Sequence, residues 1–199
     1  MEDFMLRFIA CSIATLTLAV APVALHAQED ERPASDRYTV AGAFGGLSGP
    51  ARLNGAGAPD WRQGWAGSVD GTYWLGKNVG LRAGSTLAQD RARSATLGGQ
   101  MFNKITYDAD VVLRAPRHAG EGTVIPYVVA GAGGITIHPI GSGSSWTKAA
   151  GNAGAGLEYR FARWGLRAEA RDYLYQFDRY GYRQTQNQVA WQGGLTLSF

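Results

Sequence analysis

Polar and apolar residues alternate along much of this 199-residue chain, with the period of two that a β-strand requires. The segment from Val189 to Phe199 is the clearest case, because every second residue is apolar or glycine and the residues between are small or polar. After Gln28, no segment of helical length repeats apolar residues at three-and-four spacing, and glycine, which occurs 28 times in the chain, interrupts the nearest candidates. The pattern predicts an all-β chain.

Eight tracts carry this alternation, and the connections between them alternate in length. We expect strands at 37–46, 63–74, 79–88, 103–114, 124–137, 149–161, 165–176 and 188–199. Long connections fall at 47–62, 89–102, 138–148 and 177–187, and short ones at 75–78, 115–123 and 162–164. Long loops at one end and short turns at the other are typical of an eight-stranded antiparallel up-and-down transmembrane β-barrel, with its short turns in the periplasm.

A soluble lipocalin-like barrel would also show alternation, and three features favour the membrane barrel. Eight strands leave an interior that side chains must fill, and an apolar face rich in glycine and alanine would leave holes there. The first 27 residues also have the pattern of a signal for export from the cytoplasm. Aromatic residues also fall near both ends of the strands, as the two membrane interfaces favour. At the short-turn ends these are Tyr73, Trp74, Phe161, Trp164 and Phe199, and at the long-loop ends Phe44, Trp65, Phe102, Trp146 and Tyr175.

The first 27 residues predict a secretory signal peptide. An uncharged apolar stretch from Phe8 to Leu25 ends in a small residue, Ala27, and charges follow at once. Glu2 and Asp3 precede the lone Arg7, whereas initiation at Met5 would give the expected basic start. A retained membrane anchor is the alternative. We therefore expect a signal peptide at 1–27, a periplasmic tail at 28–36 and a barrel at 37–199, in the outer membrane of a Gram-negative bacterium.

Several classes of protein are excluded by composition. The single cysteine, Cys11, lies inside the signal segment, so a disulfide-stapled domain is excluded, and no Cys/His pairs have zinc spacing. The net charge of +3 comes from Lys and Arg that are dispersed singly, which does not indicate nucleic-acid binding. We expect no cofactor and no metal.

The charged faces of the strands, if they point inward, place eleven ionisable residues in the lumen. Six are basic and five acidic, so we expect cross-strand ion pairs that plug the barrel. They are Asp70, Arg82, Lys104, Asp108, Asp110, Arg114, Glu158, Arg160, Arg167, Glu169 and Arg171. The alternative is a narrow channel for ions or small solutes, with a path through rearranging Arg–carboxylate pairs.

Catalytic interpretations have weaker support. A lipid A-modifying enzyme would need His and Ser side chains close together with an acid to orient the His. His138 precedes Ser142, Ser144 and Ser145, but these lie in a Gly/Ser-rich segment typical of a flexible connection. Asp108 and Asp110 are two apart on one strand beside Lys104 and Arg114, which favours ion pairing over an acid/base pair.

The outer loops are where specific recognition would occur. Segments 47–62 and 177–184 include aromatic and Arg residues, a composition that suits anionic sugar-phosphate groups or a protein partner. A solvated hairpin with aromatics resting at the interface is the simpler interpretation.

Four runs resemble the small OmpA/OmpX-like outer-membrane β-barrel domain family, and the resemblance covers nearly all of 37–199. The runs are 126–133 (PYVVAGAG), 154–161 (GAGLEYRF), 166–171 (LRAEAR) and 194–199 (GLTLSF). It implies a porin-like barrel in contact with outer-membrane lipid and lipopolysaccharide, and it implies that Phe199 is part of the signal read by the barrel-assembly machinery. It implies no substrate, so the expected function is non-enzymatic, in envelope structure or surface interaction, with an unknown loop ligand.

Overall fold

The structure is a computed structural model of the chain. It describes residues 37–48, 60–61, 63–93, 101–119, 121–141, 144–179 and 182–199. The predicted signal peptide at 1–27 and the predicted tail at 28–36 lie outside these residues, and both stay predictions. Within the described ranges, no helix is long and apolar enough to cross a membrane.

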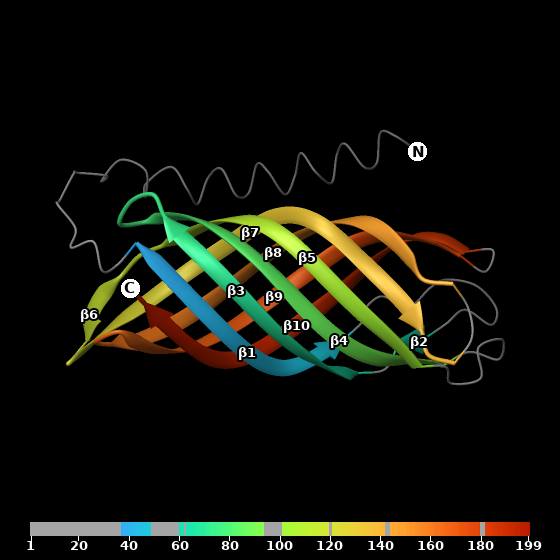
Figure 1. Cartoon of the computed structure of the whole chain (residues 1–199), viewed down its shortest axis with the longest axis horizontal. Coiled ribbons are helices and arrows are strands. Elements are labelled where there is room, and N and C mark those ends of the chain that lie inside the picture. The colour runs from blue at the N-terminus through green and yellow to red at the C-terminus, as the bar shows by residue number, and fades with distance from the viewer. Residues whose placement is uncertain are drawn as a thin grey trace.

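Eight long strands form a closed antiparallel barrel (Figure 1). They are β1 (Tyr38–Ser48), β3 (Gly64–Trp74), β4 (Val79–Arg93), β5 (Met101–Arg114), β7 (Gly122–Pro139), β8 (Trp146–Phe161), β9 (Trp164–Arg179) and β10 (Tyr182–Ser198). Each pairs with the next, and β10 returns to pair with β1. Two short strands extend the wall: β2 (Asp60–Trp61) pairs with β4, and β6 (Arg117–Ala119) pairs with β7.

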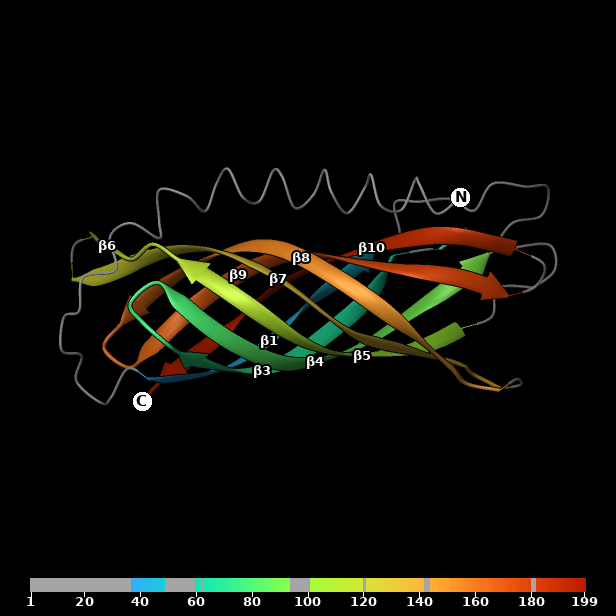
Figure 2. The ribbon, with the colours of Figure 1, turned by 90° about the horizontal axis from the view of Figure 1, so that it is seen from above.

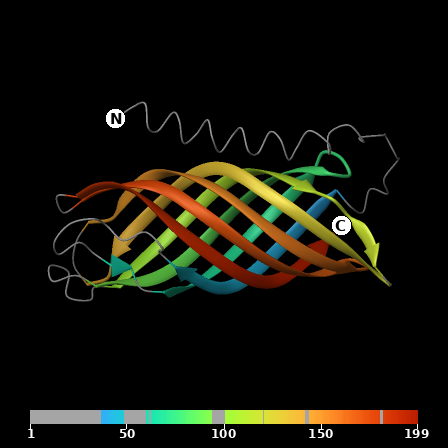
Figure 3. The ribbon, with the colours of Figure 1, turned by 180° about the vertical axis from the view of Figure 1, so that it is seen from behind.

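The strands are strongly staggered around the barrel. A row of paired residues that leaves β1 at Ser48 passes Val189 on β10 and returns to β1 at Tyr38, ten residues away. Such a stagger requires strands tilted by about 35–45° to the axis. Figures 2 and 3 show these inclined strands from above and from behind.

All eight predicted strands are present, and several run further than expected toward the long-loop end. The strand predicted to end at residue 88 continues to Arg93, and the one predicted to begin at 188 begins at Tyr182. The alternation weakens there because polar residues occupy both faces, while pairing with the neighbouring strand continues.

The two faces of the wall have the predicted orientation. Large apolar side chains such as Val69, Leu81, Ile105 and Leu195 are about half exposed on the outside, with exposed fractions of 65%, 47%, 45% and 54%. The charged residues that alternate with these apolar residues along the strands point inward and are buried. So large an exposed apolar surface suits the hydrocarbon of a bilayer.

The aromatic belts are only partly as predicted. Six of the named residues are exposed on the outer surface: Phe44, Trp65, Tyr73, Phe161, Trp164 and Phe199. The other four face the interior and are buried: Trp74, Phe102, Trp146 and Tyr175. The physical reason is the period of two, which places adjacent residues such as Tyr73 and Trp74 on opposite faces even at the end of a strand.

Several glycines of the wall lie beneath aromatic rings, and Gly134 and Gly46 are two examples. A Cβ on Gly134 would come within 2.5 Å of the Tyr107 ring, and one on Gly46 within 2.4 Å of the Trp191 ring. Each ring therefore packs against bare backbone of the neighbouring strand, a pairing that compensates for the side chain glycine lacks.

Candidate functional site: the barrel interior

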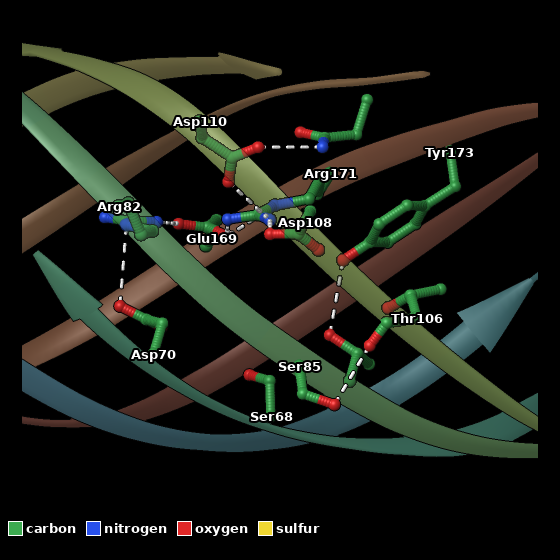
Figure 4. Close-up of polar contacts among 12 residues, drawn as sticks. Ser68, Asp70, Arg82, Ser85, Thr106, Asp108, Asp110, Glu169, Arg171 and Tyr173 are labelled. Carbon is green, nitrogen blue, oxygen red and sulfur yellow. Dashed lines mark hydrogen bonds and ion pairs between the residues drawn. The ribbon is translucent and has the colours of Figure 1, made fainter. Parts of the chain in front are cut away.

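Seven of the eleven predicted lumen residues meet in one group, which we call the central cluster. It consists of Asp70 on β3, Arg82 on β4, Asp108 and Asp110 on β5, and Arg167, Glu169 and Arg171 on β9. Strands β4 and β9 are not neighbours in the sheet, so the contacts cross the lumen. Figure 4 labels six of these side chains, all except Arg167, and shows them converging from opposite walls.

Glu169 bridges two arginines at the middle of this cluster. Its Oε2 lies 2.7 Å from Arg82 Nη1, and its Oε1 lies 2.9 Å from Arg171 Nη2. Tyr127 also donates a hydrogen bond of 2.7 Å to Oε2. One carboxylate thus accepts from three donors, and charge-assisted bonds of this kind are the strong ones.

Asp70 is held by a two-pronged contact with Arg167. The Nη1 atom of Arg167 donates to Oδ1 at 3.0 Å, and Nη2 donates to Oδ2. Arg82 is a second cation beside Asp70, with its Nε 3.4 Å from Asp70 Oδ1. A planar guanidinium fits a carboxylate in this paired geometry, which fixes the relative position of β3 and β9 across the lumen.

Asp108 and Asp110 share one arginine. Arg171 Nη1 lies 2.9 Å from Asp108 Oδ1 and 3.0 Å from Asp110 Oδ2. Asn152 donates a further bond of 2.8 Å to Asp110 Oδ1. The side chains of the two aspartates are 3% and 0% exposed, so their geometry is that of buried ion pairs rather than of an acid/base pair open to a substrate.

Lys104 lies nearer the long-loop end, in what we call the outer layer. Its Nζ is 2.6 Å from Asp90 Oδ2, and the two side chains are 1% and 2% exposed. Asp90 is not among the predicted lumen residues, because the predicted strand ends at residue 88. Extending the alternation by two residues would have placed Asp90 on the inner face.

Apolar side chains form much of the rest of the outer layer, together with the buried amide of Gln188, which donates a 3.4 Å hydrogen bond to Asp90 Oδ2. Phe102, Ile135, Ile137 and Trp146 are buried on the inner face, and the Phe102 and Trp146 rings meet edge to face at 6.4 Å. Ile137 pairs in register with both Lys104 and Trp146, so the apolar group adjoins the Lys104–Asp90 pair. Near the long loops, apolar packing therefore occupies much of the inner face, which the predicted network of ion pairs did not anticipate.

The three remaining predicted residues lie at the short-turn end. Arg114 stacks over the Trp74 ring at 3.5 Å and donates a 2.9 Å bond to the Lys77 carbonyl. Glu158 and Arg160, two apart on β8, pair with each other at 2.6 Å. The eleven residues thus lie at three levels along the barrel axis: the central cluster, the outer layer and the short-turn end. The spacing of residues along a single strand does not predict this division.

Little space is left beside the central cluster. A cavity of about 10 Å³ lies next to Asp108 and Glu169, bordered by Ser68, Gly84 and Thr86. That volume holds about one water molecule. In the part of the chain that the structure describes, no group of three or more His, Cys, Asp or Glu side chains is placed to hold a metal ion.

A separate polar contact lies on the exposed surface near the long loops. His138 Nδ1 and Ser145 Oγ are 2.5 Å apart, between the end of β7 and the start of β8. Ser144 is also exposed, and Ser142 lies outside the described residues. The structure therefore brings the predicted histidine and one of its three serines together.

Comparison with solved structures identifies the fold. The structure of Neisserial surface protein A matches this chain with a TM-score of 0.56 and 14% sequence identity. The match covers 81% of this chain and 96% of the Neisserial protein. The chain has the fold of a small outer-membrane β-barrel. Two weaker matches are the N-terminal barrel of Pseudomonas aeruginosa OprF and Ail of Yersinia pestis. OprF matches with a TM-score of 0.48 and 21% identity, and Ail with 0.47 and 15%. Each match covers 82% of this chain, together with 98% of the OprF domain and 99% of Ail.

The small outer-membrane barrel fold agrees with the OmpA/OmpX-like resemblance of the sequence. No protein-family model and no curated protein matches the chain.

Proposed function

We propose that this protein is a non-enzymatic barrel of the outer membrane with a closed, charge-filled lumen, which serves envelope structure or surface interaction through its outer loops. The observation that carries the proposal is the bridge that Glu169 makes between Arg82 and Arg171 across the lumen. Because the adjoining cavity holds about one water molecule, a path for bulk solutes would require these ion pairs to separate.

The apolar outer surface and the fold shared with Neisserial surface protein A support a place in the outer membrane. By the general topology of such barrels, the short-turn end faces the periplasm and the long loops face outward. The partners are then outer-membrane lipid and lipopolysaccharide around the wall.

Phe199 would serve as part of the assembly signal. Its ring is exposed and lies 6.0 Å from the Tyr38 ring, and its backbone exchanges two 2.9 Å hydrogen bonds with Tyr38. A residue in this position is fixed by the barrel seam while its ring stays accessible. Replacing Phe199 with alanine should therefore reduce the amount of barrel assembled in cells more than it reduces the stability of the refolded protein.

Single-channel recording in planar bilayers tests the closed lumen. Wild-type protein should give no sustained conductance at steady voltage. The double variant Arg82→Ala/Glu169→Ala should conduct, because it removes the central bridge and leaves space for water. The matched control Lys148→Ala/Asp178→Ala removes an exposed ion pair and should stay closed. Sustained wild-type currents would support the narrow-channel alternative instead.

A second candidate function, lipid modification by hydrolysis, is favoured by the 2.5 Å contact between His138 and Ser145. In such a reaction the serine oxygen would attack an acyl ester carbonyl while the histidine takes its proton. The ester bond would break, the lipid hydroxyl would leave with that proton, and water would later release the acyl group from serine as a fatty acid. Among the described residues no carboxylate contacts His138, so this candidate ranks second. Lipid A acylation measured with Ser145→Ala, with Ser144→Ala as control, decides it, and equal acylation in both variants rejects it.

A further inference from the structure

The short-turn end of the barrel carries a group of exposed basic side chains, which we call the basic collar. Arg37 precedes β1, Lys77 lies in the β3–β4 turn, Arg117 lies on β6, and Arg163 lies in the β8–β9 turn, and all four are exposed. These segments gather at the left of Figure 1, beside the start of β1.

Among the residues that the structure describes, few acidic groups offset the basic collar. Glu121 is exposed in the turn after β6. Glu158 lies at the same end but is buried and paired with Arg160 at 2.6 Å. Among the described residues, the collar therefore keeps a positive excess that faces solvent or a partner.

Backbone contacts fix the positions of the collar residues. The Arg37 carbonyl accepts from the Trp74 amide at 2.9 Å, and the Arg163 carbonyl accepts from the Ser198 amide at 2.8 Å. The Lys77 carbonyl accepts from Arg114 Nε at 2.9 Å. The backbone beneath these three side chains is thus ordered, which lowers the entropy cost of using them in binding.

An aromatic girdle next to the collar sets its depth in the membrane. Its six members are 39–50% exposed on the outer surface: Tyr38, Tyr73, Tyr159, Phe161, Trp164 and Phe199. Tyr38 lies 5.3 Å from the Tyr73 ring, and Tyr159 lies 6.4 Å from the Phe161 ring. Exposed aromatic rings prefer the interface between hydrocarbon and headgroups, so charges just beyond them lie at the depth of lipid phosphates.

We propose that the basic collar binds the phosphodiester groups of anionic phospholipids in the leaflet that faces the periplasm. This inference rests on the proposed place of the barrel in the outer membrane. Basic residues at a membrane surface attract anionic lipid by electrostatics, and Arg in addition makes paired hydrogen bonds with phosphate. The adjoining girdle favours lipid over the acidic peptides of the cell wall, which lie further from the hydrocarbon.

The opposite end offers a natural comparison. There Lys148 is already paired with Asp178 at 2.5 Å, while Arg91 and Arg183 are exposed. Removing two cations from each end therefore changes the net charge equally, and only the place of the charge differs. The test variants are Arg37→Gln/Arg163→Gln for the collar and Arg91→Gln/Arg183→Gln for the control.

The experiment reconstitutes the purified protein in nanodiscs of four parts phosphatidylcholine and one part phosphatidylglycerol. Native mass spectrometry then counts the lipids of each kind that stay bound. Wild-type protein should retain phosphatidylglycerol above its share of the bilayer. The collar variant should lower the ratio of bound phosphatidylglycerol to bound phosphatidylcholine at least about fivefold, because it removes two basic residues that attract anionic lipid at the membrane surface. The control variant should keep the wild-type ratio.

Three outcomes would overturn the inference. Wild-type protein with no enrichment, or a control variant that loses as much as the collar variant, would show that the collar selects no lipid. Co-sedimentation with purified cell-wall sacculi that the collar variant alone loses, with unchanged lipid counts, would assign the collar to the cell wall instead. Circular dichroism of the same nanodiscs separates these results from a failure of the proposed function, since a protein that forms no β-structure in the bilayer is no membrane barrel.

Discussion

The central cluster and the outer layer occupy the same lumen but are held together by different interactions. In the central cluster, Glu169 contacts two arginines and a tyrosine, and Arg171 contacts three carboxylates. In the outer layer, one ion pair between Lys104 and Asp90 adjoins apolar side chains such as Phe102. The central cluster depends on opposite charges held at fixed positions, whereas the outer layer depends mainly on close packing of its side chains.

This difference predicts how each level tolerates change. A buried ionic network fails when one member is removed, because its partners are left charged and desolvated. An apolar group loses only the contacts of the atoms that are deleted, and it tolerates a swap of similar volume. Substitutions at the two levels should therefore differ in size and in whether a second substitution can rescue them.

The largest effect is expected for Glu169→Gln in the central cluster. The substitution keeps the shape of the side chain but removes the negative charge between Arg82 and Arg171, so the free energy of unfolding should fall by about 4–5 kcal/mol. Urea unfolding in lipid vesicles, followed by tryptophan fluorescence, measures this. An unchanged urea midpoint would contradict the cross-lumen network.

Lys104→Met should cost about 3 kcal/mol, because it leaves Asp90 buried without its cation. Adding Asp90→Leu should return the stability to within about 1 kcal/mol of wild type, since two apolar residues can replace a buried pair among apolar neighbours. The same urea titration of both single variants and the double variant gives the coupling energy. Additive losses would mean that the outer layer behaves like the central cluster.

Phe102→Leu should lower the stability by about 1 kcal/mol, because the leucine fills most of the same volume beside Trp146. The measurement is the urea midpoint relative to wild type. A loss as large as that of Glu169→Gln would remove the distinction between packing and charge on which the comparison depends.

The smallest effect is expected at the rim, for Lys148→Gln. Its partner Asp178 is 39% exposed, so the pair contributes about 0.5 kcal/mol or less. The effect should vanish in about 0.5 M salt, whereas that of Glu169→Gln should persist, because buried charges are screened much less. Unfolding at two salt concentrations checks both.

Much of the fold follows from local pattern. Alternation at tracts such as 103–114 predicts both the strand and its buried face, because successive side chains of a strand point to opposite sides. The fold class and the inward placement of the charged residues could therefore be predicted without any three-dimensional information. The structure supports both.

The interior arrangement depends on register between strands, which no single strand records. The partner of Arg167 is Asp70, 97 residues earlier in the chain, and Glu169 meets Arg82 across 87 residues. Neighbours along the strand favour pairs such as Glu158 with Arg160, which the structure shows, but they do not indicate contacts across the lumen. The aromatic character of Trp74 predicts a place in the outer belt, whereas its position in the alternation, next to the exposed Tyr73, places it inside the barrel.

The seam of the barrel has a consequence for how the protein forms. It joins β1 to β10, and Thr39 contacts Ser198 at 3.0 Å across 159 residues. Until that last pairing is made, the sheet has two open edges whose unpaired amides and carbonyls can recruit strands from other molecules. Closure over so long a loop is slow. During folding, closure of the barrel therefore competes with aggregation. Conditions that delay the pairing of β1 with β10 should lower the yield of folded protein without changing the structure of the finished barrel.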